Sequence, residues 1–320
     1  MCSNGAKQSP INILTGDVLP HPDGICPFVF HGYNANPLKF NIKNEGNTIY
    51  FSVVMNQNTA MPYITGGGLP EKEKFEFHSG HFHWNSEGQS GSCHHVDNMD
   101  APLELHLVHW NKKKGNNLTS AISTNEWNAL AVLGIIYDIG KHNKGLDPLF
   151  DALDEVHGNG KSVGLSNGYT LKTFLPRGTG RFFRYNGSLT TPPCNEVVIW
   201  TVFKDREFIS KEQLNKLRDT IKGVNNNRPV QPLNERNVLD IDTRDYDGHC
   251  SDFSSAAVCP SSPSPGCDCP SAIEPRPYPD CSSHANNFHM QNKFASSLLA
   301  VVTNINLQFS KLLLKWTLIL

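Results

Sequence analysis

Residues 103–110 read Leu-Glu-Leu-His-Leu-Val-His-Trp, and the leucine at every second position predicts a β-strand. In such a strand Glu104, His106 and Val108 share one face, and the leucines share the other. A buried acid or imidazole without a hydrogen-bond partner costs about 2–7 kcal/mol. A metal ion, with the carboxylate holding the second nitrogen of its histidine ligand, would supply the missing partners.

A second stretch, His81-Phe82-His83-Trp84, places two more imidazoles on one face of a strand, and Ser79 shares that face. Three neutral histidines with no cysteine indicate zinc with an open fourth position. Two alternatives stay open on this evidence. The histidines could be ordinary core or surface residues. His81 and His83 could also join Glu87 in the iron or manganese site of a cupin, although the flanking glycine and proline pattern of cupins is absent.

The chain is 320 residues long, which suits two average domains or one large β-rich domain with appendages. Its 28 Lys and Arg against 30 Asp and Glu give a net charge of −2, which provides no electrostatic case for a nucleic-acid partner. Hydrophobic residues make up 38% of the chain, enough for a substantial core. A wholly disordered protein is therefore excluded.

Residues 1–242 contain short β-like runs separated by Gly, Asn and Pro, and we expect them to form one domain. The clearest runs are residues 49–54, 75–84, 103–110 and 197–203. Residues 127–137 are mostly apolar, so periodicity does not decide between a strand and a helix. Residues 210–221 predict a helix, because Ser210 is a good N-cap and apolar side chains recur at helical spacing.

The composition changes after about residue 242. Seven of the 21 prolines fall between Pro260 and Pro279, so residues 243–293 are expected to be a linker or tail, disordered or pinned by disulfides. Residues 294–320 are apolar but interrupted by Asn, Gln and Lys. They fit a GPI-anchor signal, a transmembrane anchor or a free amphipathic end, and the sequence leaves these three interpretations open.

Five of the nine cysteines lie within residues 250–281, and no C-x-x-C pair occurs, so a zinc ribbon is not indicated. The spacing predicts an oxidised tail and an extracellular protein, secreted or anchored at the cell surface. The alternative is a cytosolic chain with reduced thiols. No signal peptide is visible. The tripeptide Asn117-Leu118-Thr119 fits a glycosylation sequon.

A third stretch, residues 185–196, decides between the metal-site interpretations. It reads Tyr-Asn-Gly-Ser-Leu-Thr-Thr-Pro-Pro-Cys-Asn-Glu, and together with the motifs around it resembles the α-class carbonic anhydrases. The resemblance covers residues 2–242. The matching motifs, in family order, are QSPINI at 8–13, HFHW at 81–84, ELHLVHW at 104–110, SLTTPP at 188–193 and RPVQPL at 228–233.

The resemblance implies a mostly β fold with short helices, built on a central, mainly antiparallel sheet of about ten strands. It also implies a zinc enzyme that hydrates carbon dioxide reversibly to bicarbonate and a proton, by attack of zinc-bound hydroxide. The family's opening segment is missing, which suggests an N-terminus that is truncated relative to the secreted or membrane-anchored members.

The resemblance also implies roles for individual residues. The zinc ligands match His81, His83 and His106. Glu104 matches the carboxylate that holds the third ligand, and Thr190 matches the threonine that orients the zinc-bound hydroxide, with Thr191 beside it. The carbon dioxide pocket matches Val108, Val132, Leu189, Val198 and Trp200. Cys2 and Cys194 match the disulfide common in secreted members.

Four positions depart from the family pattern. Cys93 takes the place of the gate glutamate that accepts the threonine's hydroxyl proton, and a thiol is a weak acceptor. Ser79 replaces a longer Gln that holds the first ligand, and Gly80 replaces a larger residue. Asn47 takes the place of the proton-shuttle histidine, and Asn does not titrate near neutral pH.

These departures leave two functions open. One is a working carbonic anhydrase, slower than the best members. The other is a zinc-loaded relative with weak or no activity that serves as a binding or matrix protein. The three ligands, Glu104 and Thr190 favour the first function, and Cys93 favours the second. Cys93 could instead pair with Cys26 in a second disulfide. The expected partners are carbon dioxide and bicarbonate, with membrane attachment through the C-terminus as a further expectation.

Overall fold

The computed structural model describes residues 2, 5–21, 24–86, 88, 90–165 and 168–246. The chain divides into two units, residues 1–257 and 258–320, and the second lies outside the described residues. The expectations for the linker and the apolar C-terminal segment therefore fall outside them too, apart from residues 243–246. Within the described part of the chain, no helix is long and apolar enough to cross a membrane.

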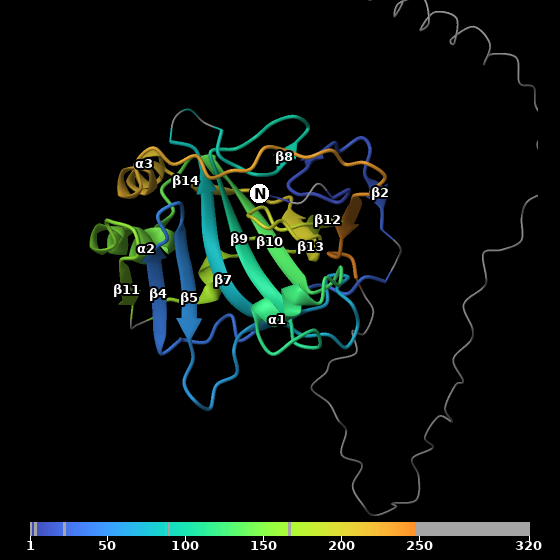
Figure 1. Cartoon of the computed structure of the whole chain (residues 1–320), viewed down its shortest axis with the longest axis horizontal. Helices are drawn as coiled ribbons and strands as arrows, with labels where there is room; N and C mark the ends of the chain where they lie inside the picture. The colour runs from blue at the N-terminus through green and yellow to red at the C-terminus, as the bar shows by residue number, and fades with distance from the viewer. Residues whose placement is uncertain are drawn as a thin grey trace, which may run out of the picture. The chain divides into compact units, whose positions relative to one another are not determined.

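One large sheet dominates the described residues (Figure 1). Its continuous path has ten strands. In spatial order these are β11 (Ser162–Leu165), β4 (Lys39–Asn44), β5 (Ile49–Val54), β7 (Phe75–Trp84), β9 (Leu103–Asn111), β10 (Leu130–Ile139), β13 (Val198–Phe203), β12 (Arg181–Gly187), β15 (Leu239–Asp242) and β2 (Leu19–Pro20). Three strands lie off this path: β14 (Glu207–Ile209), β6 (Tyr63–Thr65) and β3 (Val29–His31).

Most neighbouring strands in this sheet are antiparallel. The parallel pairs are β10 with β13, β10 with β14, and β15 with β2. A separate two-stranded parallel pair joins β1 (Asn12–Ile13) to β8 (His95–Val96). The predicted fold, mostly β around a mainly antiparallel sheet of about ten strands, is confirmed.

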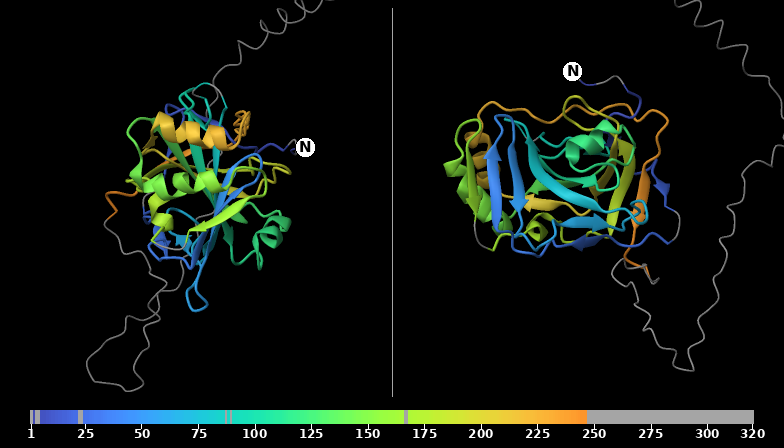
Figure 2. Two further views of the ribbon diagram at one scale, coloured as in Figure 1. Left: turned by 90° about the vertical axis from the view of Figure 1, so that its left-hand side faces the viewer. Right: turned by 60° about the horizontal axis from the view of Figure 1, so that its bottom comes forward.

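The helices are short and lie around the sheet. They are α1 (Leu118–Ser123), α2 (Asp147–Ala152) and α3 (Lys211–Thr220), with single turns of 3-10 helix at Lys144–Leu146, Leu153–Glu155 and Leu171–Phe174. Figure 2 shows α2 and α3 side by side at the edge of the sheet near β4 and β11. The predicted helix is α3. Ser210 caps it, because the Ser210 hydroxyl accepts from the Gln213 backbone N–H in a capping box.

The four strands predicted from the sequence correspond to β5, β7, β9 and β13, and each predicted end lies within one residue of the observed end. The ambiguous stretch at 127–137 is a strand, since β10 covers residues 130–139 and pairs with β9 on one side and β13 on the other. Both faces of a central strand are covered, which explains why no alternation was visible. Trp127 lies before this strand and its side chain is half-exposed.

Strand β9 separates two packed clusters. All nine of its residues are buried. Leu103, Leu105 and Leu107 belong to the larger cluster, which includes Phe51, whereas Val108 belongs to the smaller one. Gly80 of β7 lies opposite Phe51, and a Cβ atom at Gly80 would come within 2.1 Å of the Phe51 ring. Phe51 thus fills the space that a larger residue at position 80 would occupy.

Candidate active site

Strands β7 and β9 bring three histidines together. In their antiparallel register His81 lies opposite His106, and His83 lies opposite Glu104. One ligand-type nitrogen of each imidazole lies within 4.8 Å of those of the other two. The three histidines therefore lie on one face of the sheet, as the alternation of residues along the two strands predicts. Glu87, the acid of the cupin alternative, lies outside the described residues.

The three imidazoles fit a metal ion. His83 Nε2 is buried and, among the described residues, has no hydrogen-bond partner. Burial lowers the pKa of His81 well below its usual value, lowers that of His106, and lowers that of His83 to about 3. All three rings are therefore neutral at neutral pH and can offer a lone pair. A set of three neutral imidazole ligands suits zinc.

Asn226 holds the second histidine in place. Its backbone carbonyl accepts a hydrogen bond from His83 Nδ1 at 2.9 Å, which leaves Nε2 directed to the cluster. The Asn226 side chain accepts from the Trp84 N–H at 2.7 Å and donates to the carbonyls of Phe82 and Asn47. Sequence reasoning missed Asn226. The one available signal was its position just before the RPVQPL motif.

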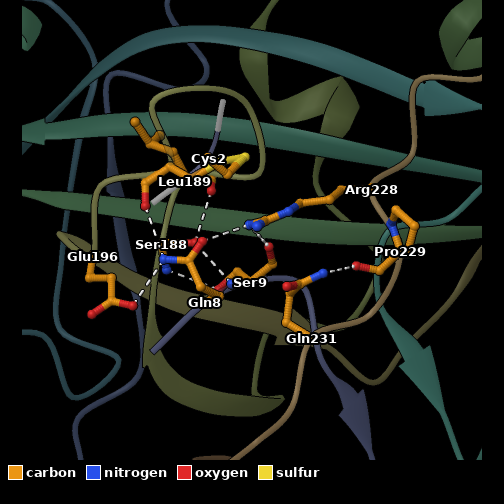
Figure 3. Close-up of a disulfide and its surroundings, with 10 residues drawn as sticks. Cys2, Gln8, Ser9, Ser188, Leu189, Glu196, Arg228, Pro229 and Gln231 are labelled. Carbon is orange, nitrogen blue, oxygen red and sulfur yellow. Dashed lines mark hydrogen bonds between the residues drawn. A yellow bond between two sulfur atoms is a disulfide. The ribbon is translucent and has the colours of Figure 1, made fainter. Parts of the chain in front are cut away.

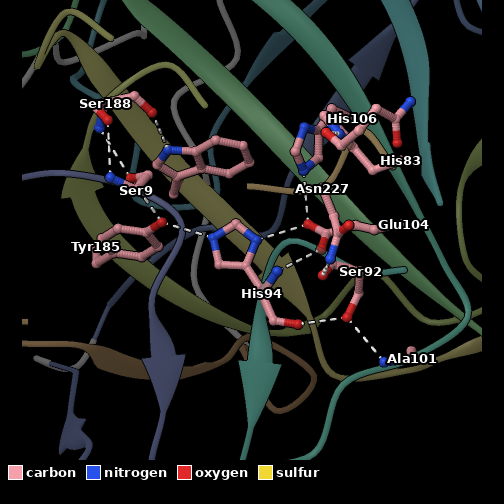
Figure 4. Close-up of polar contacts among 12 residues, drawn as sticks. Ser9, His83, Ser92, His94, Ala101, Glu104, His106, Tyr185, Ser188 and Asn227 are labelled. Atoms are coloured by element: carbon pink, nitrogen blue, oxygen red, sulfur yellow. Dashed lines mark hydrogen bonds and ion pairs between the residues drawn. The ribbon is translucent and has the colours of Figure 1, made fainter. Parts of the chain in front are cut away.

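Glu104 holds the third histidine from a fully buried position (Figure 4). Its Oε1 accepts from His106 Nε2 at 2.8 Å and from His94 Nδ1 at 2.7 Å, while Oε2 accepts from the His94 backbone N–H at 2.8 Å. Burial raises the pKa of Glu104, but His94 and His106 outweigh burial and hold it well below its usual value. Glu104 is thus an ionised acceptor that fixes the orientation of the His106 ring.

His94 extends this network to the N-terminal segment. Its Nε2 is hydrogen-bonded to the Tyr185 hydroxyl at 2.7 Å, and Tyr185 donates to Ser9 Oγ at 2.9 Å. Ser9 Oγ in turn accepts from the Ser188 backbone N–H at 3.0 Å. The chain of contacts therefore links Glu104 to the loop that precedes Thr190. No local pattern of residues pointed to this role of His94.

His81 is the least constrained of the three histidines. It is half-buried, and among the described residues its ring has no hydrogen-bond partner. Ser79, which replaces the longer glutamine of the family, instead has its hydroxyl 2.9 Å from Nδ1 of His78. The short side chain at position 79 thus leaves the first histidine without the support that the other two receive.

An apolar wall lies beside the histidines. Val108 of β9, Val132 of β10 and Trp200 of β13 follow one another across neighbouring strands in direct register. All three are buried in one cluster with Val198, and Leu189 packs against that cluster. The Trp200 ring lies 4.8 Å from the His106 ring, measured between centroids. A small apolar molecule therefore has a surface to contact next to the candidate metal position.

The loop with Thr190 and Thr191 is braced at both ends. Before it, the Ser188 carbonyl accepts from Trp200 Nε1 at 2.9 Å. After it, Cys194 forms a disulfide with Cys2, and the Gln8 amide donates to the Cys194 carbonyl at 3.2 Å (Figure 3). Thr190 is nearly buried and Thr191 is exposed. Within the described part of the chain, the Thr190 side chain makes no hydrogen bond.

Cys93 is fully buried and is a free thiol, as is the half-buried Cys26, so the alternative of a Cys26–Cys93 disulfide is wrong. Cys93 Sγ lies within 4.8 Å of ligand-type atoms of Glu104 and His106. Burial raises its pKa well above the usual value, and the neighbouring Glu104 raises it further. Position 93, where the resemblance implies a gate carboxylate, therefore holds a neutral thiol.

Comparisons with known proteins show which family the chain is similar to. The model of the eukaryotic-type carbonic anhydrase family matches residues 1–241. The chain is 34% identical to putative carbonic anhydrase 5 of Caenorhabditis elegans, over 80% of this chain and 82% of that protein. It is 34% identical to carbonic anhydrase 1 of Mus musculus, over 74% of this chain and 90% of the mouse protein. For carbonic anhydrase 1 of Oryctolagus cuniculus the identity is 33%, over 73% and 98% respectively.

Proposed function

We propose that this chain, which belongs to the eukaryotic-type carbonic anhydrase family, is an active enzyme that hydrates carbon dioxide reversibly to bicarbonate and a proton. We further propose that His81, His83 and His106 hold a zinc ion. The observation that carries the proposal is His83 Nε2, a buried nitrogen that has no hydrogen-bond partner among the described residues and belongs to a cluster of neutral imidazoles.

Zinc, when bound, lowers the pKa of a coordinated water to about 7, an effect for which carbonic anhydrase is itself the reference case. The protein's part is to position that chemistry. Glu104 and the Asn226 carbonyl fix two of the three imidazole rings, and such supporting contacts commonly contribute 10–100-fold to metal affinity or activity. Glu104 is fully buried and Asn226 is half-buried, so solvent is kept away from the Glu104 hydrogen bonds in particular.

The apolar wall and the threonine loop would position the substrate. Val108, Val132 and Trp200 present carbon and ring surface beside the histidines, which suits carbon dioxide because the molecule has no net charge or dipole. Thr190 is the hydroxyl nearest in sequence to the braced Ser188, and we assign it the task of orienting the attacking oxygen. The disulfide and the Trp200–Ser188 hydrogen bond restrain the loop that carries it.

A second candidate function rests on Cys93. Its buried thiol is neutral and cannot supply the charge-assisted hydrogen bond that a carboxylate would. If hydration of carbon dioxide requires that hydrogen bond, the protein would bind zinc but have weak or no activity. All three histidines and the Glu104 network are present, however, and these favour the enzyme.

Carbon dioxide hydration by the zinc-loaded full chain, followed by stopped flow with a pH indicator, tests the proposal. We expect saturable hydration that is lost on removal of the metal and restored by adding zinc. Stoichiometric zinc without hydration above the buffer blank would reject the enzyme and leave the binding protein.

We also propose that the protein works outside the cytosol, secreted or anchored at the cell surface. The Cys2–Cys194 disulfide supports this, because disulfides persist in oxidising compartments. The sequon at Asn117 is consistent with it, since Asn117 is exposed at the start of α1.

A further inference from the structure

His78 is an imidazole beside the candidate metal centre to which no role has been assigned. Strand β7 has a β-bulge at this point, because Phe77 pairs with His109 and Ser79 pairs with Val108, which leaves His78 as the extra residue. Bulges commonly redirect a side chain next to an active site. His78 is three residues from His81, which corresponds to about 10 Å along the strand.

His78 is held by a small polar network. Its Nδ1 lies 2.9 Å from Ser79 Oγ, and Ser79 is also hydrogen-bonded to the Tyr50 hydroxyl. Tyr50 is the cross-strand neighbour of His81 in the register of β5 and β7, and its ring also contacts that of His78. Among the described residues, His78 Nε2 has no hydrogen-bond partner, so this nitrogen is left to exchange protons with water.

His78 also borders open space. It lines a groove of about 520 Å³ together with Met61, Glu76, Trp110 and Leu118. Trp110 lies two residues from Val108 on the same face of β9, so the groove lies next to the apolar wall of the site. His78 is half-buried, which gives its ring both a fixed position and contact with solvent.

The charged and titratable groups around His78 are few. On its own strand Glu76 lines the groove, and this carboxylate is paired with Lys112 at 2.8 Å. From β5 the Tyr50 ring approaches it edge-on at 6.5 Å between centroids. The α1 residues in the groove, Leu118 and Thr119, are uncharged. Burial lowers the pKa of His78 below its usual value, so the ring is neutral and able to accept a proton at neutral pH.

We propose that His78 is the proton-transfer residue of this enzyme and replaces the histidine that is absent at position 47. Each hydration of carbon dioxide releases one proton. Cavity water passes that proton to the neutral imidazole of His78, and the imidazolium then gives it to a buffer base in solvent, which restores the neutral ring. No electrons are transferred. The inference rests on the proposed function, since it requires turnover.

The test compares the zinc-loaded full chain with His78→Ala and His78→Gln in weak buffer. Gln can keep a hydrogen bond to Ser79 but does not titrate near neutral pH. We expect both variants to lose roughly tenfold or more in kcat, since a positioned proton-transfer group contributes about 10²–10⁴-fold and water offers a slower parallel route. The ratio kcat/KM, which reports carbon dioxide hydration itself, should stay within about twofold, and added imidazole should restore kcat.

A second readout does not depend on turnover. In ¹⁵N NMR spectra of the imidazoles, the signal that disappears in His78→Gln should titrate reversibly at a pH below about 6.5. An unchanged kcat in both variants, a full kcat in His78→Gln alone, or an imidazole signal that does not titrate would each overturn the role of His78. If the wild-type protein does not hydrate carbon dioxide at all, the proposed function fails instead, and the two failures are thereby distinguished.

Discussion

Glu104 and Cys93 are buried side chains that both lie close to His106, and their chemical environments differ. Glu104 is ionised and accepts three hydrogen bonds, two from imidazole rings and one from a backbone N–H. Cys93 is a neutral thiol, and Arg228 favours its ionised form, through its backbone N–H and its positive charge, too weakly to offset burial and Glu104. The network that orients His106 therefore has a full set of hydrogen bonds, whereas position 93 offers only a weak acceptor for the role that the resemblance implies toward Thr190.

Under the proposed function, this difference predicts that metal binding and turnover depend on separate residues. Changes on the Glu104 side should act first on zinc affinity. Changes on the Cys93 side should act on rate and leave zinc in place. Each variant below either separates these two properties or shows that they are coupled.

The largest effect is expected for His106→Ala. It removes one of three nitrogen ligands and leaves Glu104 without one of its hydrogen-bond donors, so zinc should fall from one ion per chain to a trace. Elemental analysis of the purified protein measures this. His142→Ala is the matched control, because His142 is an exposed histidine paired with Asp147 far from the cluster in sequence. Full zinc content in His106→Ala would refute the ligand assignment.

Next in size is Glu104→Gln. Both rings bond Oε1, and the His94 backbone N–H bonds Oε2. An amide has one oxygen acceptor, so its NH2 group must face either both rings or the His94 backbone N–H, and the support of His106 is weakened. Zinc affinity should fall by about 10–100-fold, the range found for carboxylates that support a metal-bound histidine. Competition with a chelator measures it. Cys93→Ser, which is nearly isosteric, should leave zinc affinity unchanged, and equal losses in the two variants would show that the two sides of the site are not separate.

Cys93→Glu tests the other side of the comparison. A charge-assisted hydrogen bond contributes about 1.5–3 kcal/mol, against much less for a thiol acceptor. If the new carboxylate accepts from Thr190, kcat/KM should rise by roughly tenfold to a hundredfold, at about 1.4 kcal/mol per decade. Zinc content should not change. The melting temperature is measured on the same sample, since position 93 is fully buried and a longer side chain must be accommodated.

No gain in kcat/KM at an unchanged melting temperature would mean that Thr190 does not depend on position 93. If the wild-type protein hydrates carbon dioxide, that result would also remove the argument for the second candidate function, because the thiol would then not slow the enzyme. A lower melting temperature with a gain in rate would still support the comparison, since the burial cost and the catalytic gain are separate quantities.

Alternation along β7 and β9 was sufficient to place His81, His83, His106 and Glu104 on one face. Residues two apart in a regular strand have their side chains on the same face. Because β7 and β9 pair in one continuous register around the histidines, the matching faces of the two strands also lie side by side. The motifs in family order added Val132 and Trp200, which no local pattern connects to β9. The structure shows that they lie in a single row with Val108.

The remaining contacts were not predictable from local sequence, for physical reasons. Asn226 reaches His83 across 143 positions of the chain, and a carbonyl acceptor carries no side-chain signal. His94 lies in a loop between strands, where the side chains follow neither the two-residue period of a strand nor the 3.6-residue period of a helix. His78 is the extra residue of a bulge, so counting by twos from His81 assigns it to the wrong face.

The smallest effect is expected for Asn47→His. Asn47 is exposed, and its backbone carbonyl accepts a hydrogen bond from Asn226 Nδ2 at 2.7 Å, so an imidazole there would start from a fixed backbone next to the residue that holds His83. In weak buffer the variant should raise kcat by less than about tenfold, because His78 already carries protons in the wild type. The gain should be larger in a His78→Ala background, where the two positions no longer compete. Asn47→Gln, which is polar but does not titrate, should give no gain in either background. An equal gain from Gln and His would assign the effect to packing at position 47, and no gain from His in the His78→Ala background would show that proton transfer does not limit turnover.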